Sequence, residues 1–244
     1  MFSLNIFFLV PLGLLPSLVW LLFYLRKDKH PESNKMVVKV FLAGGAAGLP
    51  AIFLEKAAQQ VLQSLLASYL PIITSLGVIL VAAIIEETVK YSAAFLAAFR
   101  NKELDEPIDV LLYLIIAALG FAALENILAL AKFYPAIYTF KALELTFWRF
   151  CSATFLHALC SGALGYWLAM AFCRRARKWL YLLIGLTMSI GLHGVYNWAI
   201  MKVSSETFGP EAILIPLLIL LCLGWLAGRW FRKLKKLKSV CLIK

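Results

Sequence analysis

Long apolar runs recur along the chain, with only short polar joints between them. Each run is close to the length of about 20 residues that a helix needs to cross roughly 30 Å of hydrocarbon. The runs cover 4–25, 37–54, 71–99, 108–131, 147–172, 179–201 and 210–228. Hydrophobic residues make up 63% of the 244 positions and charged residues 15%, far from the balance of a soluble domain. The sequence therefore predicts an all-α, polytopic membrane protein of about seven transmembrane helices, forming a single integral membrane domain over 1–244.

One connector between these runs has a helical pattern of its own. In residues 55–70, apolar side chains recur at positions 57, 58, 61, 62, 65 and 66, which is helical spacing. This spacing suggests an amphipathic helix that lies at the membrane interface or covers a loop, and a plain amphipathic connector is the simpler interpretation.

Lys and Arg are distributed unevenly over the joints. Most of the 24 lie in alternate joints and in the tail, at 26–35, 100–102, 174–178 and 229–244. Because cytoplasmic loops carry the excess of basic residues, this pattern predicts a multi-pass protein of the cell membrane with its N-terminus outside and its C-terminus in the cytoplasm. The net charge of +11 then comes from basic residues that face the anionic headgroups of the lipid bilayer, and it does not imply binding to nucleic acid.

Ionisable side chains interrupt four of the apolar runs. A charge at the centre of a bilayer costs about 3 kcal/mol or more, so such residues usually face the protein interior and mark a working site. The candidates are Glu86, Glu87 and Lys90 in the third run, Glu125 in the fourth, His157 in the fifth, and His193 in the sixth, with Asn197 one turn further. We expect the catalytic core that holds them to span about 71–201.

Helical spacing indicates which of these side chains cooperate. Glu86 and Lys90 are four residues apart, and Glu87 is three from Lys90. One ammonium therefore holds one carboxylate ionised and leaves the other for chemistry. His193 and Asn197 are likewise one turn apart on the same face.

The four runs also place these residues at comparable depth. Counted from the predicted outer ends, Glu125, His193 and His157 lie roughly 10, 12 and 15 Å into the membrane at 1.5 Å per residue. Glu86 lies deeper, at about 22 Å, but its long run has room to tilt or to project outward. We therefore expect one polar chamber in the outer half of the membrane.

A set of carboxylates, two imidazoles and an amide suits the hydrolysis of a peptide bond. One group takes a proton from water, while another stabilises the oxyanion that forms on the scissile carbonyl. A serine nucleophile is not favoured, because Ser161, four residues after His157, has no evident base and orienting acid around it.

Four short motifs from consecutive runs carry a family resemblance. They are EETVK (86–90), FAALE (121–125), FLHALCSG around His157, and HGVYN (193–197). In order and spacing this set resembles the PrsW family of intramembrane proteases, relatives of the CAAX prenyl protease and bacteriocin-processing (CPBP) enzymes. The resemblance implies a peptidase that requires the paired glutamates and the histidines and cuts a membrane-anchored protein. PrsW proteins are similar to site-1 enzymes, which clip an anti-sigma factor outside the membrane to begin a signalling cascade.

Two positions depart from the prenyl protease branch of these relatives. There the second motif ends in His and the first has Arg one position later, whereas the residues here are Glu125 and Lys90. The difference argues against prenylated substrates.

Two mechanisms remain open at this stage. In the one we favour, no metal is required and Glu86 activates water with help from Glu125. Lys90 and Glu87 then set the ionisation of Glu86. His193 and Asn197 form the oxyanion hole.

In the other mechanism, a divalent metal such as zinc is bound by carboxylate and imidazole ligands, and Glu87 is the base. The ligands would be Glu86, Glu125, His157 and His193. The sequence lacks HExxH, the local pattern most typical of zinc proteases.

Two other classes of protein fit parts of the pattern. A transporter would use polar midplane residues to relay protons or to bind its substrate, although no internal repeat is evident. A non-enzymatic scaffold would keep Glu86 and Lys90 as a buried ion pair that fixes helix packing. The GGAAG segment at 44–48 has the small-residue spacing of helix packing or of a homodimer interface.

Overall fold

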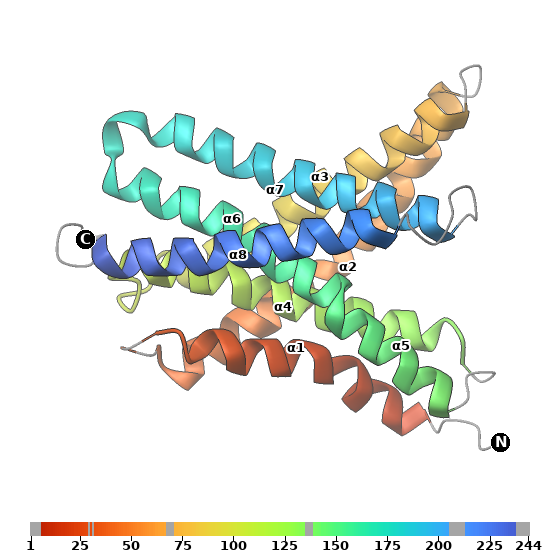
Figure 1. Ribbon diagram of the computed structural model, residues 1–244, viewed down its shortest axis with the longest axis horizontal. Coiled ribbons are helices and arrows are strands. Elements are labelled where there is room, and N and C mark those ends of the chain that lie inside the picture. The colour runs from red at the N-terminus through yellow and green to blue at the C-terminus, as the bar shows by residue number, and fades with distance from the viewer. Residues whose placement is uncertain are drawn as a thin grey trace.

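The protein is a bundle of long helices (Figure 1). The computed structural model describes residues 6–28, 30, 32–66, 71–134, 139–204 and 213–237. All regular structure in this part of the chain is helical. The α-helices are α1 (Leu9–Leu25), α2 (Asn34–Leu65), α3 (Pro71–Ala98), α4 (Pro107–Ala131), α5 (Thr139–Cys151), α6 (Ala153–Cys173), α7 (Lys178–Ser204) and α8 (Leu214–Leu237).

Five helical stretches are long and apolar enough to cross a membrane: α2, α4, α5 with α6, α7 and α8. The helix α1 is apolar but shorter, at 17 residues. In α3 the apolar run carries the three charged side chains noted in the sequence, Glu86, Glu87 and Lys90. These lengths confirm the prediction of an all-helical, polytopic membrane protein.

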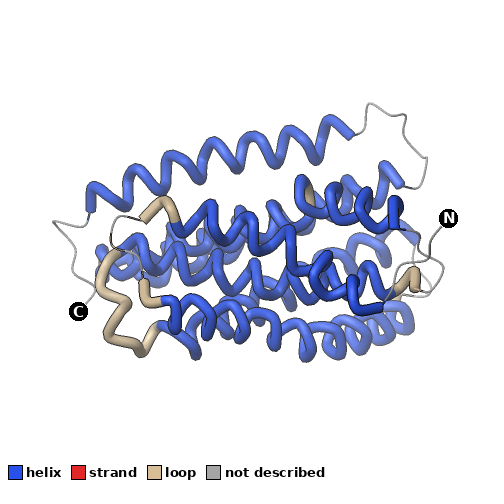
Figure 2. The backbone as a smooth tube through the Cα atoms, turned by 90° about the horizontal axis from the view of Figure 1, so that it is seen from below, coloured by secondary structure: helices blue, strands red, loops and turns tan. Residues whose placement is uncertain are grey.

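The central helix of the bundle is α4. It contacts α1, α2, α3, α5, α6 and α8, and every residue from Pro107 to Ala123 is buried. A helix that is apolar on all sides is expected at the core rather than at the surface. In contrast, α8 lies along the outside of the bundle, at the top of the view in Figure 2.

Two helices differ in extent from the sequence prediction. The amphipathic segment expected at 55–70 is not a separate helix over its described part, because α2 continues without interruption to Leu65; residues 67–70 lie outside the described residues. This segment is rich in Ala, Gln and Leu, which favour propagation of an existing helix over a new nucleus. The fifth run also begins earlier than predicted, since α5 starts at Thr139 and is separated from α6 only by a one-residue break at Ser152.

Two glycines bring α2 and α4 into close backbone contact. A Cβ atom at Gly44 would lie 2.0 Å from the carbonyl oxygen of Ala117, and one at Gly120 would lie 1.9 Å from that of Phe41. No side chain fits between such backbones. The GGAAG segment therefore serves helix packing within the chain.

Gly120→Ala is expected to destabilise the protein by about 1–3 kcal/mol, the usual cost of forcing extra volume into a packed interior. The effect would appear as a lower midpoint of thermal unfolding in detergent. Gly228→Ala is the matched control, because a Cβ atom there meets nothing within 4 Å. Equal midpoints for the two variants would contradict the close packing of α2 on α4.

A polar cluster closes the end of the bundle where α4 begins. The Asp109 carboxylate accepts hydrogen bonds from the backbone N–H groups of Asp105 and Glu106, at 3.1 and 2.7 Å, and so caps the helix. One turn further along α4, the Tyr113 hydroxyl donates to the carboxylate of Glu32, which precedes α2. These contacts fix the α1–α2 connection against the start of α4.

Glu32 gives this cluster a pH dependence. Burial raises the pKa of Glu32 from 4.5 to about 7, and the negative charges of Glu103 and Asp28 act in the same direction, although the hydrogen bond from Tyr113 opposes them. The folded state thus holds the proton more tightly than the unfolded state. The stability from this group is fully present below pH 4.5 and is lost as the pH rises through about 7.

We expect Glu32→Gln to flatten the fall in thermal midpoint between pH 5 and pH 8, because Gln keeps the neutral form at every pH. Unfolding midpoints of both proteins in the same detergent would measure the difference. If the two profiles run parallel, Glu32 does not titrate in this range.

Candidate active site

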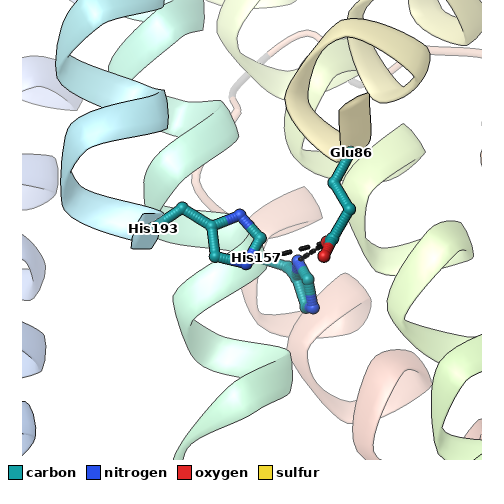
Figure 3. Close-up of side chains that lie close together, drawn as sticks. All are labelled: Glu86, His157 and His193. Carbon is teal, nitrogen blue, oxygen red and sulfur yellow. Dashed lines mark ion pairs between the residues drawn. The ribbon is translucent and has the colours of Figure 1, made fainter. Parts of the chain in front are cut away.

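Three side chains from three different helices converge inside the bundle (Figure 3). Glu86 extends from α3, His157 from α6 and His193 from α7. The Glu86 Oε2 atom lies 3.8 Å from His157 Nδ1 and 3.7 Å from His193 Nε2. All three residues are buried, at 6%, 3% and 2% exposure, so their polar atoms face the protein and not the surrounding lipid.

Lys90 lies between these residues and Glu87. Its Nζ atom is 2.6 Å from Glu87 Oε1, 3.4 Å from Glu86 Oε2 and 2.8 Å from His157 Nδ1. The face of Phe121 lies beside it, with the ring centroid 4.8 Å from Nζ. The prediction was that the ammonium holds one carboxylate; it lies within 4 Å of both, and the shorter contact is with Glu87.

Glu87 is fully buried and fully engaged. Its Oε1 atom is in contact with Lys90 and, at 2.8 Å, with His193 Nδ1. Its Oε2 atom accepts hydrogen bonds from Ser189 at 2.6 Å and from Ser161 at 3.3 Å. With both oxygens bound by the protein, Glu87 is placed to hold its neighbours and has no oxygen left to receive a proton from water.

The partners of each histidine define its tautomer. His157 Nδ1 faces the ammonium of Lys90 and accepts from it, so its Nε2–H donates to Glu125 Oε2 at 2.8 Å. His193 donates from Nδ1 to Glu87 Oε1, which leaves Nε2 with a lone pair. Both lone pairs, on His157 Nδ1 and His193 Nε2, lie on the side of Glu86.

Glu125 joins the site from α4 through His157 and is held in turn by residues that the sequence did not single out. Arg149 Nη2 lies 3.4 Å from Glu125 Oε2, and the Arg149 side chain also donates to Asn126. Asn126 in turn donates to Thr154 at 3.0 Å. Arg149 and Asn126 thus form an outer support for the pair of Glu125 and His157.

The structure therefore brings six of the seven predicted site residues together. Asn197 is partly buried one turn beyond His193, and none of the hydrogen bonds or ion pairs described for this cluster involves its side chain. Ser189 was missed by the sequence analysis, although its position four residues before His193 places it on the same face of α7.

The donor atoms fit a divalent metal ion. Glu86, His157 and His193 each offer one ligand atom, and the three atoms lie within 4.8 Å of one another. Two imidazoles and one carboxylate are a common ligand set of catalytic zinc. Metal-binding histidines almost always donate their other N–H to a carboxylate or a backbone carbonyl, as His157 does to Glu125 and His193 to Glu87.

A bundle of membrane-length helices with carboxylates and imidazoles gathered in its interior is the arrangement of an intramembrane hydrolase. The model of one protein family, described as PrsW family intramembrane metalloprotease, matches residues 32–225. The chain therefore belongs to the PrsW family, and it is a peptidase.

Individual relatives agree with this assignment over nearly the full length. The chain is 29% identical over 236 residues to Protease PrsW of Geobacillus kaustophilus, covering 96% of this chain and 93% of the relative. It is 28% identical over 209 residues to Protease PrsW of Oceanobacillus iheyensis, with 86% and 88% covered. For Protease PrsW of Bacillus subtilis the identity is 26% over 240 residues, with 96% and 97% covered. No solved structure matches the chain.

Proposed function

We propose that Glu86 activates the water molecule that hydrolyses a peptide bond of a membrane-anchored protein. The observation that carries this proposal is the convergence of Glu86 with His157 and His193 in a buried cluster. Of the two glutamates on α3, Glu86 has the looser contact with Lys90, at 3.4 Å against 2.6 Å for Glu87. Its carboxylate is therefore the one free to take a proton from water.

The neighbouring residues would then position this carboxylate and stabilise the charge that forms. Lys90 lies 3.4 Å from the Glu86 carboxylate, so its ammonium is the donor nearest to an oxyanion on the scissile carbonyl. His193 presents the lone pair of Nε2 on this side and would donate there only after taking up a proton. Glu87 and Glu125 orient the two histidines from outside. Burial strengthens each of these interactions because little water competes with them.

We further propose that Glu86, His157 and His193 hold a divalent metal ion, in place of the metal-free route favoured from the sequence. Two findings support this: the arrangement of the donor atoms and the description of the family as metalloproteases. A bound zinc ion would lower the pKa of its water and polarise a carbonyl oxygen, and on this route it would replace Glu86 as the group that activates water. Lys90 has to withdraw from His157 Nδ1 when an ion binds, since it lies 2.8 Å from that nitrogen.

Metal analysis of the purified protein tests this point directly. We expect bound zinc or another divalent ion in the wild type, loss of cleavage after treatment with a chelator, and recovery when the metal is added back. Cleavage that persists in the chelated, metal-free protein would restore the metal-free mechanism.

The substrate we propose is a single-span membrane protein similar to an anti-sigma factor, cut near the outer face of the membrane. Two sequence observations support this side: the distribution of Lys and Arg favours an N-terminus outside, and counting along the predicted spans then puts Glu125, His157 and His193 in the outer half. A cysteine-labelling experiment with a membrane-impermeant reagent, using single cysteines placed in the α1–α2 and α4–α5 connections, would test the orientation. Labelling of the α1–α2 connection in intact cells would reverse it.

Comparison of protein termini in membranes carrying the wild type or an inactive variant would identify the substrate. The expected result is a new terminus, within or close to a transmembrane segment, that is present only with the wild type. If no terminus depends on the active protein in cells known to contain its substrate pathway, proteolysis of a membrane-anchored protein is the wrong function.

A further inference from the structure

A groove of about 580 Å³ lies between α1 and α8, on the outside of the bundle and away from the catalytic cluster. Its floor is formed by stacked aromatic pairs from different helices. Trp20 of α1 stacks on Phe155 of α6, with ring centroids 4.2 Å apart, and Tyr24 of α1 stacks on Phe231 of α8 at 5.9 Å. The groove therefore has a rigid, apolar floor.

Three cations gather at one end of this groove. Lys27 follows the end of α1, and Arg232 and Lys235 lie in the last turns of α8. The helices α1 and α8 run in the same direction in Figure 1 and end on the same side of the molecule. All three cations therefore lie towards the same end of the groove.

The charges of these cations are not balanced by acids of the groove. Its lining contains no Asp or Glu, and in the described part of the chain none of the ion pairs joins Lys27, Arg232 or Lys235 to a carboxylate. Lys27 instead lies over the ring of Phe23, with Nζ 4.3 Å from its centroid. An anionic group is thus the complement that this end of the groove lacks.

The apolar part of the groove has the length of one membrane leaflet. On α8 its lining extends from Leu220 to Phe231 before the cations begin. At 1.5 Å per residue this is about 16 Å, roughly half of the 30 Å hydrocarbon core. The space beside Gly228 in this lining is open, since a Cβ atom there would meet nothing within 4 Å.

We propose that this groove is a binding site for one anionic phospholipid. An acyl chain lies along the aromatic floor, and the phosphate is bound by Lys27, Arg232 and Lys235. The groove combines an apolar part as long as one leaflet with a cationic end that no acid balances. A phospholipid has this same division into an apolar chain and an anionic headgroup, whereas the negative charges of a peptide segment need not all lie at one end. The site is independent of the proposed catalytic function.

Native mass spectrometry of the full-length protein in detergent tests the proposal. The delipidated protein is titrated with phosphatidylglycerol or with phosphatidylcholine that carries the same acyl chains. We expect tighter binding of phosphatidylglycerol by about tenfold or more, since each nearby Lys or Arg strengthens binding to an anionic headgroup several-fold. Lys27→Gln combined with Arg232→Gln should remove this preference.

A charge-matched variant separates the groove from the general basic surface. Arg26→Gln combined with Lys236→Gln removes the same amount of charge from neighbouring positions, and Lys236 borders the other side of α8. This variant should keep the preference for phosphatidylglycerol. Gly228→Leu fills the groove and should weaken phosphatidylglycerol binding several-fold while the helix content stays unchanged.

Three results would overturn the proposal. The first is equal binding of the two lipids by the wild type. The second is the same loss of preference in the charge-matched variant as in the groove variant, which would reduce the effect to net charge. The third is displacement of the lipid by millimolar inorganic phosphate, which would show that the cations bind a free anion without any contribution from the apolar channel.

Discussion

Glu86→Gln is expected to reduce cleavage of a membrane-anchored substrate by about a thousandfold or more. Removal of a group that transfers the proton typically costs between a hundredfold and ten-thousandfold, and on the metal-bound route the same variant would instead lose a metal ligand. The measurement is the rate of product formation by purified protein in liposomes that contain the substrate. The same variant supplies the inactive protein for the comparison of membrane termini.

The fold should survive this substitution. Among the ion pairs of the described residues, the shortest that involves Glu86 is the one to Lys90 at 3.4 Å, and Gln has the same size as Glu. Glu144→Gln on α5 is the matched control, since Glu144 pairs with Lys141 at the surface and should leave cleavage unchanged. Near-normal cleavage by Glu86→Gln, with a normal thermal midpoint, would exclude Glu86 as the residue that activates water.

The second large effect concerns the stability of the site. Lys90→Met should destabilise the protein by about 3–5 kcal/mol, because it leaves the buried Glu87 carboxylate without its cation. Lys90 is fully buried and contacts Glu87, Glu86 and His157. Thermal unfolding in detergent measures the loss.

A second variant distinguishes an uncompensated charge from a packing defect. Adding Glu87→Gln to Lys90→Met removes the orphaned charge and should recover a large part of the stability, while cleavage stays lost. Lys141→Met removes the ammonium from a surface pair with the same three-residue spacing and should leave the midpoint unchanged. If Lys90→Met unfolds at the wild-type temperature, the ion pair does not stabilise the fold.

The composition and periodicity of the sequence were sufficient for the architecture and for most of the site. Apolar runs of membrane length have few alternatives to a helix, because the bilayer offers no partner for free backbone groups. Charged residues inside such runs had to face inward, so Glu86, Glu125, His157 and His193 could be assigned to one site before any contact was known.

Other features depend on contacts between distant segments and could not be read from local pattern. Arg149 lies at the end of a helix whose start was not predicted, and its role became visible only through Glu125. The roles of the paired glutamates could be told apart only from interatomic distances, since their spacing alone allowed Lys90 to hold either one. The continuous course of α2 was missed because the polar residues from Glu55 onward ended the apolar run at 54, whereas the helix continues to Leu65.

The enclosed position of α4 bears on how the chain enters the bilayer during synthesis. Its neighbours α5, α6 and α8 follow it in the sequence, so the ribosome delivers α4 before half of its final surroundings exist. Lipid tails must solvate that side in the meantime. An apolar surface on every side of α4 therefore suits both stages, the insertion into lipid before α5, α6 and α8 exist and the packed interior of the finished bundle.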